Sequence, residues 1–236
     1  MRDYLLFIDT EANGLPKKWN EPYSNNKNWP HIVQIAWIIH HKDGREIKRE
    51  NHYILDPAFK ISAQAKKIHG ITAEFLANHG EDRKLVMRML SDDLGKYQPM
   101  LIGHFMELDL HLLNADFYRS GIESVLKDLP VFCTMLASAK YVQNYGVDNL
   151  RLGELYVLLF NKKAENLHNA LGDATATAES YFELIKRGDI NEKLIEQQQE
   201  LILKKQYQDD KHIKWSYCIF VLLLIIIIIF LLWKTL

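Results

Sequence analysis

Near the end of the 236-residue chain, residues 217–233 read YCIFVLLLIIIIIFLLW and contain no charged side chain. These 17 residues are at the lower limit of the roughly 17–25 that a helix needs to cross a bilayer. A buried core helix is the alternative, but aromatic rings at both ends, Trp215 and Trp233, are typical of interfacial anchors. We therefore expect a transmembrane helix over residues 215–233 and a short tail, residues 234–236.

Basic residues stand mainly on one side of this segment: Lys204, Lys205, Lys211 and Lys214 before it, and Lys234 after it. The positive-inside rule then predicts a single-pass C-terminal membrane anchor, with the preceding chain in the cytoplasm. Residues 188–214 are polar, with a few apolar residues at roughly helical spacing. They are expected to form a solvated helical linker, with a coiled-coil contact as the alternative.

The rest of the chain has an ordinary soluble composition, and its charges nearly balance. With a net charge of −1, the protein lacks the broad cationic surface of a protein that coats nucleic acid. An enzyme that grips one strand end locally is still compatible with this charge. Its two cysteines, Cys133 and Cys218, exclude a disulfide framework within the soluble part and fit a reducing compartment.

Residues 1–187 alternate between strand-like and helical patterns. Buried strands are expected at residues 4–8, 31–40, 45–55, 100–103 and 130–133, with a hairpin turn at residues 42–44. Helices are expected at residues 73–77, 82–97, 107–119, 134–141, 149–160 and 169–186. A hairpin followed by alternating helices and strands indicates one α/β domain over residues 1–187, with helices packed on a mixed sheet.

Three acidic residues lie at or after the ends of two expected strands. Asp9 and Glu11 are one residue apart at the end of the first strand, so both carboxylates point to the same face. Asp109 lies near the start of the helix that follows residues 100–103 and would face back toward the strand ends. Taken alone, the first pair could be an ordinary surface feature, and Asp109 could be one acid among several in an amphipathic helix.

A histidine and a fourth acidic residue, His168 and Asp173, lie at the start of the last helix, where Asn166 or Asn169 could provide the cap. Small residues along this helix would let it approach the sheet and bring Asp173 toward Asp9. Because histidine titrates near neutral pH, it can take a proton from water. On its own, His168 could instead be a solvated cap residue.

Such a set of side chains suits the hydrolysis of a phosphodiester. The reaction needs a polarised phosphorus, an activated water and a stabilised leaving oxygen, and two divalent metals roughly 3.5–4 Å apart supply all three. Carboxylate oxygens are the ligands that Mg²⁺ and Mn²⁺ prefer. We therefore expect two Mg²⁺ or Mn²⁺ ions as cofactors.

The motifs that carry these residues resemble those of the DEDDh exonucleases, the DnaQ-like group that includes polymerase proofreading subunits and RNase T. They read FIDTEANG at residues 7–14, GHFMELD at 103–109 and HNALGD at 168–173. Two shorter stretches also look like family sequence, IHGIT at 68–72 and CTM at 133–135. The resemblance spans about residues 3–185. It implies a ribonuclease H-like α/β/α sandwich with a mixed five-stranded sheet.

The resemblance also implies a role for each residue. Asp9, Glu11 and Asp173 would hold the metal that binds the attacking water, Asp9 and Asp109 the metal nearer the leaving oxygen, and His168 would be the general base. The expected activity is 3′–5′ hydrolysis of a single-stranded or frayed 3′ end to nucleoside monophosphates, with DNA slightly preferred over RNA. The alternatives are an RNA 3′-end trimming enzyme and a catalytically inactive tether for nucleic acid or a polymerase.

Residues in or beside the motifs are expected to contact the substrate: Thr10, Gly14, Leu15, His104 and Phe105. Leu15 resembles the apolar residue that the family places against the terminal base. The second motif departs from the family pattern, G-H-N with an aromatic residue before the aspartate, because Phe105 and Leu108 stand at those places. This departure leaves the substrate preference open.

Aromatic rings and lysines alternate in the loop of residues 16–30, which contains Trp19, Tyr23, Trp29, Lys17, Lys18 and Lys27. This pattern suits base stacking combined with attraction of phosphates. The alternative is that Trp29 packs under the adjacent strand and the lysines only keep the loop soluble. The sequence allows either use of the loop.

Overall fold

The computed structural model describes residues 2–56, 60–142 and 148–202, and the chain divides into two units, Met1–Ile195 and Glu196–Leu236. Residues 192–202, part of the expected linker, are helical. The expected transmembrane helix and the tail after it lie outside the described residues. Within the part that is described, no helix combines the length and the apolar character needed to span a membrane.

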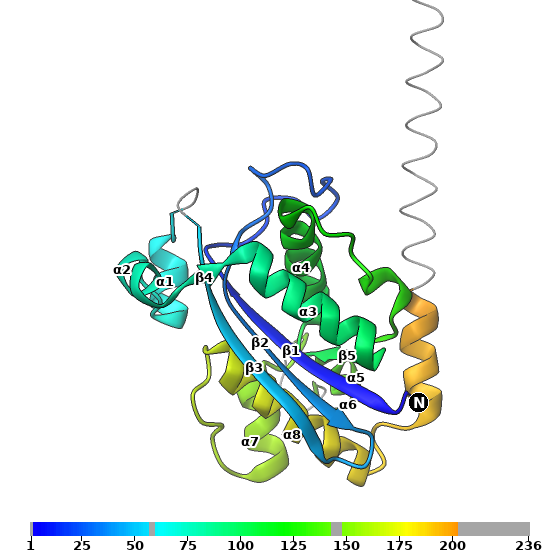
Figure 1. Ribbon diagram of the computed structural model, residues 1–236. Helices are drawn as coiled ribbons and strands as arrows, with labels where there is room; N and C mark the ends of the chain where they lie inside the picture. The colour runs from blue at the N-terminus through cyan, green and yellow to red at the C-terminus, as the bar shows by residue number, and fades with distance from the viewer. Residues whose placement is uncertain (1, 57–59, 143–147, 203–236) are drawn as a thin grey trace, which may run out of the picture. The chain divides into compact units, whose positions relative to one another are not determined.

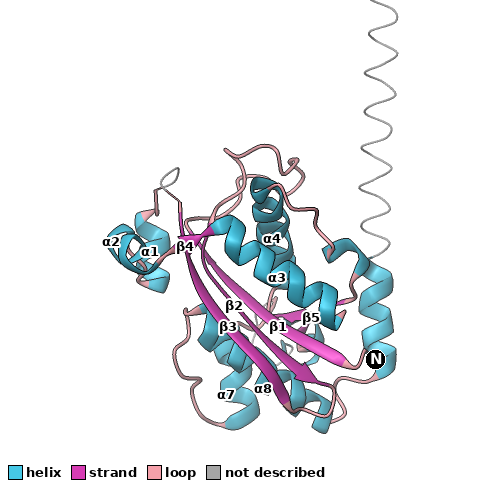
Figure 2. Ribbon diagram, viewed as in Figure 1, coloured by secondary structure: helices cyan, strands magenta, loops and turns pink. Residues whose placement is uncertain are grey.

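A mixed sheet lies at the centre of the first unit, with strands in the order β4-β3-β2-β1-β5-β6 (Figure 2). The strands are β1 (Tyr4–Ala12), β2 (Ile32–His41), β3 (Glu46–Leu55), β4 (Glu81–Asp82), β5 (Met100–Gly103) and β6 (Val131–Cys133). β2 pairs in the antiparallel direction with β1 and with β3, whereas β5 runs parallel to β1 and β6 parallel to β5. The expected mixed sheet is therefore confirmed.

The expectation of five strands is wrong, because the sheet has six. The additional strand, β4, has two residues and pairs in parallel with Ile54 and Leu55 at the end of β3. Two residues are too few to show an alternation of apolar and polar side chains, so no sequence pattern predicts such a strand.

Helices cover both faces of this sheet, as Figure 1 shows. They are α1 (Ala63–His69), α2 (Ala73–His79), α3 (Arg83–Tyr97), α4 (Met106–Ser120), α5 (Thr134–Ala137), α6 (Ala139–Val142), α7 (Leu152–Phe160) and α8 (Ala170–Lys186), with a short 3₁₀ helix, η1 (Leu126–Asp128). α8 packs on β1 and β2 and carries α7 against it, whereas α3 and α4 pack on the other face. This arrangement is the expected α/β/α sandwich.

Helix α1 is absent from the expected set. Of its seven residues it buries only Ala65, so it has no apolar periodicity for a sequence pattern to reveal. Its ends are nevertheless well formed: the Ser62 hydroxyl accepts a hydrogen bond from the backbone N–H of Ala65, and Gly70 ends the helix with a φ of 72°. Local capping therefore defines this helix more than burial does.

Alternate residues of β1 supply the cores on the two faces of the sheet. Leu5 and Phe7 pack with Tyr181 of α8 in one buried cluster. Leu6 and Ile8 are also fully buried, and the two-residue period of a strand turns them to the face covered by α3 and α4. Burying each of these side chains stabilises the fold by about 1.5–3 kcal/mol. The strand is thereby held firmly from both sides.

β1 continues four residues beyond its expected end at Ile8. Its pairing with β2 runs as far as Ala12, whereas its pairing with β5 stops at Phe7, opposite Ile102. The last residues of β1 therefore project past the end of the parallel neighbour. This edge of the sheet is the place where the acidic residues of the strand lie.

Candidate active site

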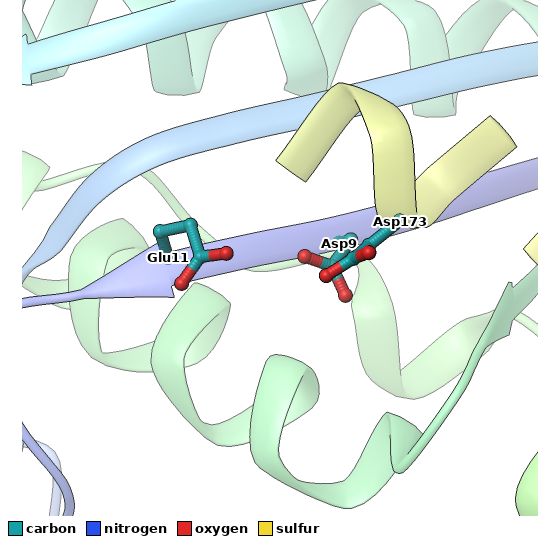
Figure 3. Close-up of side chains that lie close together, drawn as sticks. All are labelled: Asp9, Glu11 and Asp173. Atoms are coloured by element: carbon teal, nitrogen blue, oxygen red, sulfur yellow. The ribbon is translucent and has the colours of Figure 1, made fainter. Parts of the chain in front are cut away.

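The projecting end of β1 presents two carboxylates to the face of the sheet that α8 covers. Asp9 and Glu11 have the same parity as Phe7, which packs against α8, so their side chains lie on that face. Their backbone is paired with β2 at Ala36 and Gln34. Figure 3 shows the two side chains following one another along the strand. The Asp-x-Glu motif is thus held on regular strand geometry and not on a loose turn.

The N-terminus of α8 brings a third carboxylate, Asp173, over this strand end (Figure 3). Of the two asparagines considered from the sequence, Asn169 is the cap, and it accepts hydrogen bonds from the backbone N–H groups of Leu171 and Gly172. Asp173 follows one turn later. Its carboxylate accepts a hydrogen bond of 3.2 Å from the backbone N–H of His168, which fixes its orientation.

Asp9, Glu11 and Asp173 form one cluster, in which one carboxylate oxygen from each residue lies within 4.8 Å of the others. Burial is the main cause of the raised pKa values of Asp9 and Glu11, and repulsion from neighbouring carboxylates adds to it; the pKa of Glu11 rises to about 8. Burial also raises the pKa of Asp173 to about 6, against the opposing hydrogen bond from His168.

A divalent cation fits this cluster. No lysine or arginine among the described residues forms an ion pair with any of the three carboxylates, so no such side chain offsets their repulsion. A bound cation would lower the cost of keeping them ionised. The donors are all carboxylate oxygens, and such donors suit a hard ion such as Mg²⁺ or Mn²⁺.

The fourth acidic residue, Asp109, comes from the opposite face of the sheet. It is buried one turn inside α4, and its Oδ1 accepts a hydrogen bond of 2.7 Å from the Thr10 hydroxyl. Burial raises its pKa to about 7, although the hydrogen bonds from Thr10 oppose the rise. Its charge also raises the pKa values of Asp9 and Glu11, so it lies beside the cluster. Thr10, a predicted substrate contact, directs its hydroxyl to Asp109.

His168 lies in the segment just before α8, two residues ahead of the first helical residue. It is exposed, and its backbone has a φ of 64°, in the left-handed region. Asn166 is also left-handed, with a φ of 53°. Such a φ is uncommon outside glycine, although asparagine and histidine tolerate it better than most residues. The conformation leaves an exposed imidazole next to Asp173, whose pKa the histidine lowers.

The other predicted substrate contacts differ in how accessible they are. Leu15 is 70% exposed and Phe105 is 38% exposed, so both offer apolar surface to a ligand. His104 is engaged within the protein: its Nε2 donates to the Leu150 carbonyl at 3.0 Å, and its Nδ1 lies 3.0 Å from the Thr134 hydroxyl. Burial lowers the pKa of His104 to about 4, so it is neutral at pH 7. Its role as a substrate contact stays a prediction.

The segment after Gly14, where open space surrounds the backbone, leads into the loop of residues 16–30. Within it, Trp29 is buried and stacks on His111 of α4, with 4.8 Å between the ring centroids and 14° between the ring planes. Trp19 is 39% exposed, and its ring centroid lies 6.0 Å from that of Phe105. Trp29 is therefore a packing residue, whereas Trp19 and Phe105 keep exposed aromatic surface.

A buried glutamine in β2, Gln34, positions α8 and was not predicted from the sequence. Its Oε1 accepts a hydrogen bond of 3.2 Å from the backbone N–H of Ala170, the first residue of α8, and its Nε2 donates to Asn51 Oδ1 at 2.8 Å. Gln34 also pairs with Glu11 across the sheet. It thus links the end of β1 to the helix that carries Asp173. The available signal is one glutamine inside an otherwise apolar strand.

Gly172 is a second positioning residue; it was expected only as one of the small residues that let the helix approach the sheet. A Cβ at this position would lie 2.2 Å from the carbonyl oxygen of Asn166, too close for any side chain. The segment before α8 therefore packs directly on the backbone of the helix. This contact sets the place of His168, which lies between Asn166 and the helix.

Similar proteins support the interpretation of this geometry. The DNA polymerase III subunit epsilon of Buchnera aphidicola subsp. Schizaphis graminum is 25% identical over 219 residues, 89% of this chain and 82% of that protein. The subunit of the same name from Aquifex aeolicus is 25% identical over 191 residues, 79% of this chain and 85% of that protein.

Solved structures share the fold. E. coli exonuclease I in complex with a dT13 oligonucleotide has a TM-score of 0.62 and 19% identity, over 78% of this chain. The zinc-bound form of the E. coli exonuclease I complex with single-stranded DNA has a TM-score of 0.64 and 18% identity, over 79% of this chain. The chain covers only 41% of exonuclease I in each case.

A model of the RNase T family, described as an exonuclease family, matches residues 6–181, which include all four acidic residues and His168. The prediction that the chain is a 3′–5′ exonuclease is confirmed by this match and by the relatives above. The carboxylate cluster stands inside the matched region, at the edge of the sheet. The chain therefore belongs to the RNase T family of exonucleases.

Proposed function

We propose that this chain hydrolyses the 3′-terminal phosphodiester of single-stranded or frayed DNA and releases nucleoside monophosphates. The observation that supports this most directly is the cluster of Asp9, Glu11 and Asp173, whose oxygens lie within 4.8 Å of one another. The epsilon subunits of DNA polymerase III and the exonuclease I complex with dT13 favour DNA over RNA as the substrate.

Asp9, Glu11 and Asp173 would hold one divalent ion, and Asp9 together with Asp109 would hold a second. When bound, Mg²⁺ or Mn²⁺ polarises the phosphate, activates water and stabilises the leaving oxygen. The chain itself supplies rigid carboxylates: β1 fixes two of them through its pairing with β2, and the Thr10 hydroxyl orients Asp109. This preorganisation avoids a rearrangement during the reaction.

We assign the removal of the proton from the attacking water to His168. Its imidazole is exposed, and its backbone N–H is bound to the carboxylate of Asp173, so it is held beside the cluster. Leu15 and Phe105 provide exposed apolar surface for the terminal bases. Stacking on an aromatic ring contributes about 1–3 kcal/mol per base without selecting a sequence.

The test is a time course with the full chain on matched DNA and RNA oligonucleotides, with free or blocked 3′ ends, in Mn²⁺ and in EDTA. We expect monophosphates from DNA with a free 3′ end in Mn²⁺, none from blocked ends and none in EDTA. Faster release from RNA would favour an RNA 3′-end trimming enzyme. Absence of release from both polymers would contradict the proposal, and Asp9→Ala is the inactive control.

We also propose that residues 215–233 tether the enzyme to a membrane, with the exonuclease domain on the cytoplasmic side. The support comes from the sequence: an uncharged run of membrane-spanning length with most of its flanking lysines on the N-terminal side. Deleting residues 215–236 should move the protein from the membrane pellet to the supernatant. A deleted protein that still pellets in high salt would contradict a single tether.

A further inference from the structure

A cavity of about 810 Å³ lies next to the carboxylate cluster but includes none of its three residues. Its walls are the end of α1, the segment of residues 162–169 and the first half of α8, with one residue each from β3 and α7. Ligand pockets in proteins are roughly 300–1,000 Å³, so this cavity can hold more than one nucleotide-sized group. His168 lines it, and the same residue donates its backbone N–H to Asp173. His168 therefore connects the cavity to the carboxylate cluster.

Three lysines line this cavity: Lys67 from α1, and Lys162 and Lys163 from the segment before α8. All three are exposed, and none forms an ion pair with another described residue. Their ammonium groups are available to an anionic ligand. A net charge of −1 for the whole chain makes this local gathering of positive charge distinctive.

The other charged residues of the wall do not cancel these lysines. Arg49 is already paired with Glu46, at 2.8 Å between Nη2 and Oε2. Glu179 accepts a hydrogen bond of 2.5 Å from the Tyr156 hydroxyl and keeps its negative charge. With Glu165 it gives the wall two acidic residues, against three unpaired lysines. The cavity is therefore positively charged on balance.

The segment that carries Lys162 and Lys163 is packed in a defined conformation. Asn166 and His168 both have positive φ values, and Leu167 between them lies so close to Gly153 that a Cβ there would be 2.8 Å from its Cδ1. Backbone strain of this kind persists only where the surrounding structure holds it, and it concentrates at functional sites. The lysines are thus presented from a segment that the fold holds in place.

We propose that this cavity binds the phosphates of the nucleic-acid strand on the 5′ side of the bond that is cleaved. The inference rests on the proposed exonuclease function, because it takes the 3′ end of the same strand to lie at the carboxylate cluster. A strand that runs from the cluster past His168 meets Lys162, Lys163 and Lys67. Lysine ammonium groups contact phosphates without reading the bases, which suits an enzyme that removes one nucleotide after another.

The test uses the full chain carrying Lys162→Ala and Lys163→Ala together. The matched control is Lys84→Ala with Lys127→Ala, two exposed lysines on α3 and η1 that lie outside the cavity and change the net charge equally. Each protein is measured on a long single-stranded DNA and on the p-nitrophenyl ester of a nucleoside monophosphate, which has no 5′ strand. Salt dependence is recorded for both substrates.

For the long strand, we expect kcat/KM of the cavity variant to fall about tenfold at low salt, mainly through KM. The slope of log(kcat/KM) against log[salt] should become shallower by about 1.4, because each phosphate contact on a single strand contributes about 0.7. Hydrolysis of the ester should be unchanged, and the control variant should resemble the wild type on both substrates. Lys67→Ala, on a different element, should reduce the slope by about 0.7.

An unchanged KM and salt slope for the long strand would overturn the assignment of the cavity, as would an equal loss on the ester. A loss confined to duplexes with a recessed 3′ strand would place the complementary strand there and overturn the assignment to the cleaved strand. Wild-type protein that hydrolyses neither substrate in Mn²⁺ would contradict the proposed function instead. In that case, fluorescence anisotropy of the bound oligonucleotide still compares the lysine variants with the control.

Discussion

The first turns of α8 and α4 each present an aspartate four residues after the cap, but they hold it in different ways. Asn169 caps α8 through two side-chain hydrogen bonds, whereas Phe105 occupies the cap position of α4 with a φ of 67° and no side-chain hydrogen bond. Asp173 of α8 belongs to the carboxylate cluster. Asp109 of α4 is instead oriented by Thr10 from the opposite face of the sheet.

The difference follows from which face of β1 each helix covers. α8 lies on the face that Asp9 and Glu11 share, so its aspartate can join them directly. α4 lies on the other face, and its aspartate forms its hydrogen bond with Thr10, the residue between them. α8 is therefore built for a close contact with the cluster, whereas the cap of α4 leaves an aromatic ring exposed. We expect changes in α8 to affect catalysis more strongly than matched changes in α4.

The largest expected effect comes from neutralising the two aspartates in turn. Asp173→Asn should lower the rate of Mn²⁺-dependent monophosphate release by more than about a hundredfold, since losing only an outer partner of a metal site already costs roughly 10–100-fold. Asp109→Asn should lower the rate less, by about 10–100-fold, because Asp109 is proposed to hold only the second ion, which it shares with Asp9. Comparable losses of rate for the two variants would show that α8 and α4 contribute equally to catalysis, against our expectation.

The next largest effect is expected on stability, when one methyl group is added to α8. Gly172→Ala would press a Cβ against the carbonyl oxygen of Asn166, and we expect the free energy of unfolding to fall by about 1–3 kcal/mol. Gly95→Ala in α3 is the matched control, because open space surrounds that position and alanine should stabilise the helix by about 0.5–1 kcal/mol. Urea denaturation measures both free energies of unfolding; a Gly172→Ala protein as stable as the control would contradict the close contact with Asn166.

Without a bound metal, the stability of the protein should depend on pH, because the carboxylates have raised pKa values. Burial raises the pKa of Glu11 to about 8, of Asp109 to about 7 and of Asp173 to about 6, from ordinary values of 4.5 and 3.8. A carboxyl with a raised pKa binds its proton more tightly in the folded state. Its stabilising contribution is therefore complete below about pH 4 and is lost as the pH rises through 6 to 8.

Since Mg²⁺ binds the ionised carboxylates, the gain in Tm that it produces over EDTA should grow between pH 6 and pH 8. Asp109→Asn should reduce the growth of this gain in Tm toward pH 8, and Asp173→Asn should reduce it near pH 6. Thermal unfolding at several pH values measures the difference directly. A gain in Tm that does not change with pH would contradict the raised pKa values.

The smallest expected effects are changes in stability at the two caps, and they should have opposite signs. Asn169→Ala removes the cap of α8 and should destabilise the protein by about 1 kcal/mol. Phe105→Asn should instead stabilise it by up to about 1 kcal/mol, because asparagine tolerates the left-handed conformation of the α4 cap better than phenylalanine does. Chemical denaturation distinguishes the two; destabilisation by Phe105→Asn would show that its ring contact with Trp19 outweighs the backbone strain.

Most of the sheet and the longer helices could be predicted from the sequence, because each carries an apolar pattern of sufficient length. The pattern failed for α1, which buries only Ala65, and for the two-residue β4. It also ended β1 at Ile8, because apolar residues stop there although the pairing with β2 continues. Pairing with a neighbour is a tertiary property, so hydrophobic periodicity does not report it.

The same limit applies to the site. The order and spacing of the motifs identified Asp9, Glu11 and Asp173, and the structure brings all three together. The contribution of Gln34 was not predicted, because its role depends on the backbone N–H of a helix that is distant in the sequence. Nor could the sequence decide the position of Trp29, which is buried against His111 of α4.

By itself, the sequence determined the α/β class, the strand face that Asp9 and Glu11 share, and an uncharged run of membrane-spanning length over residues 217–233. These are local properties, since they follow from side-chain period and from the length of an apolar segment. Tertiary structure decided that Asp173 joins the pair, that Asp109 approaches from the other face, and how far burial raises their pKa values. Those outcomes depend on distances between remote segments, and such distances arise only when the helices pack on the sheet.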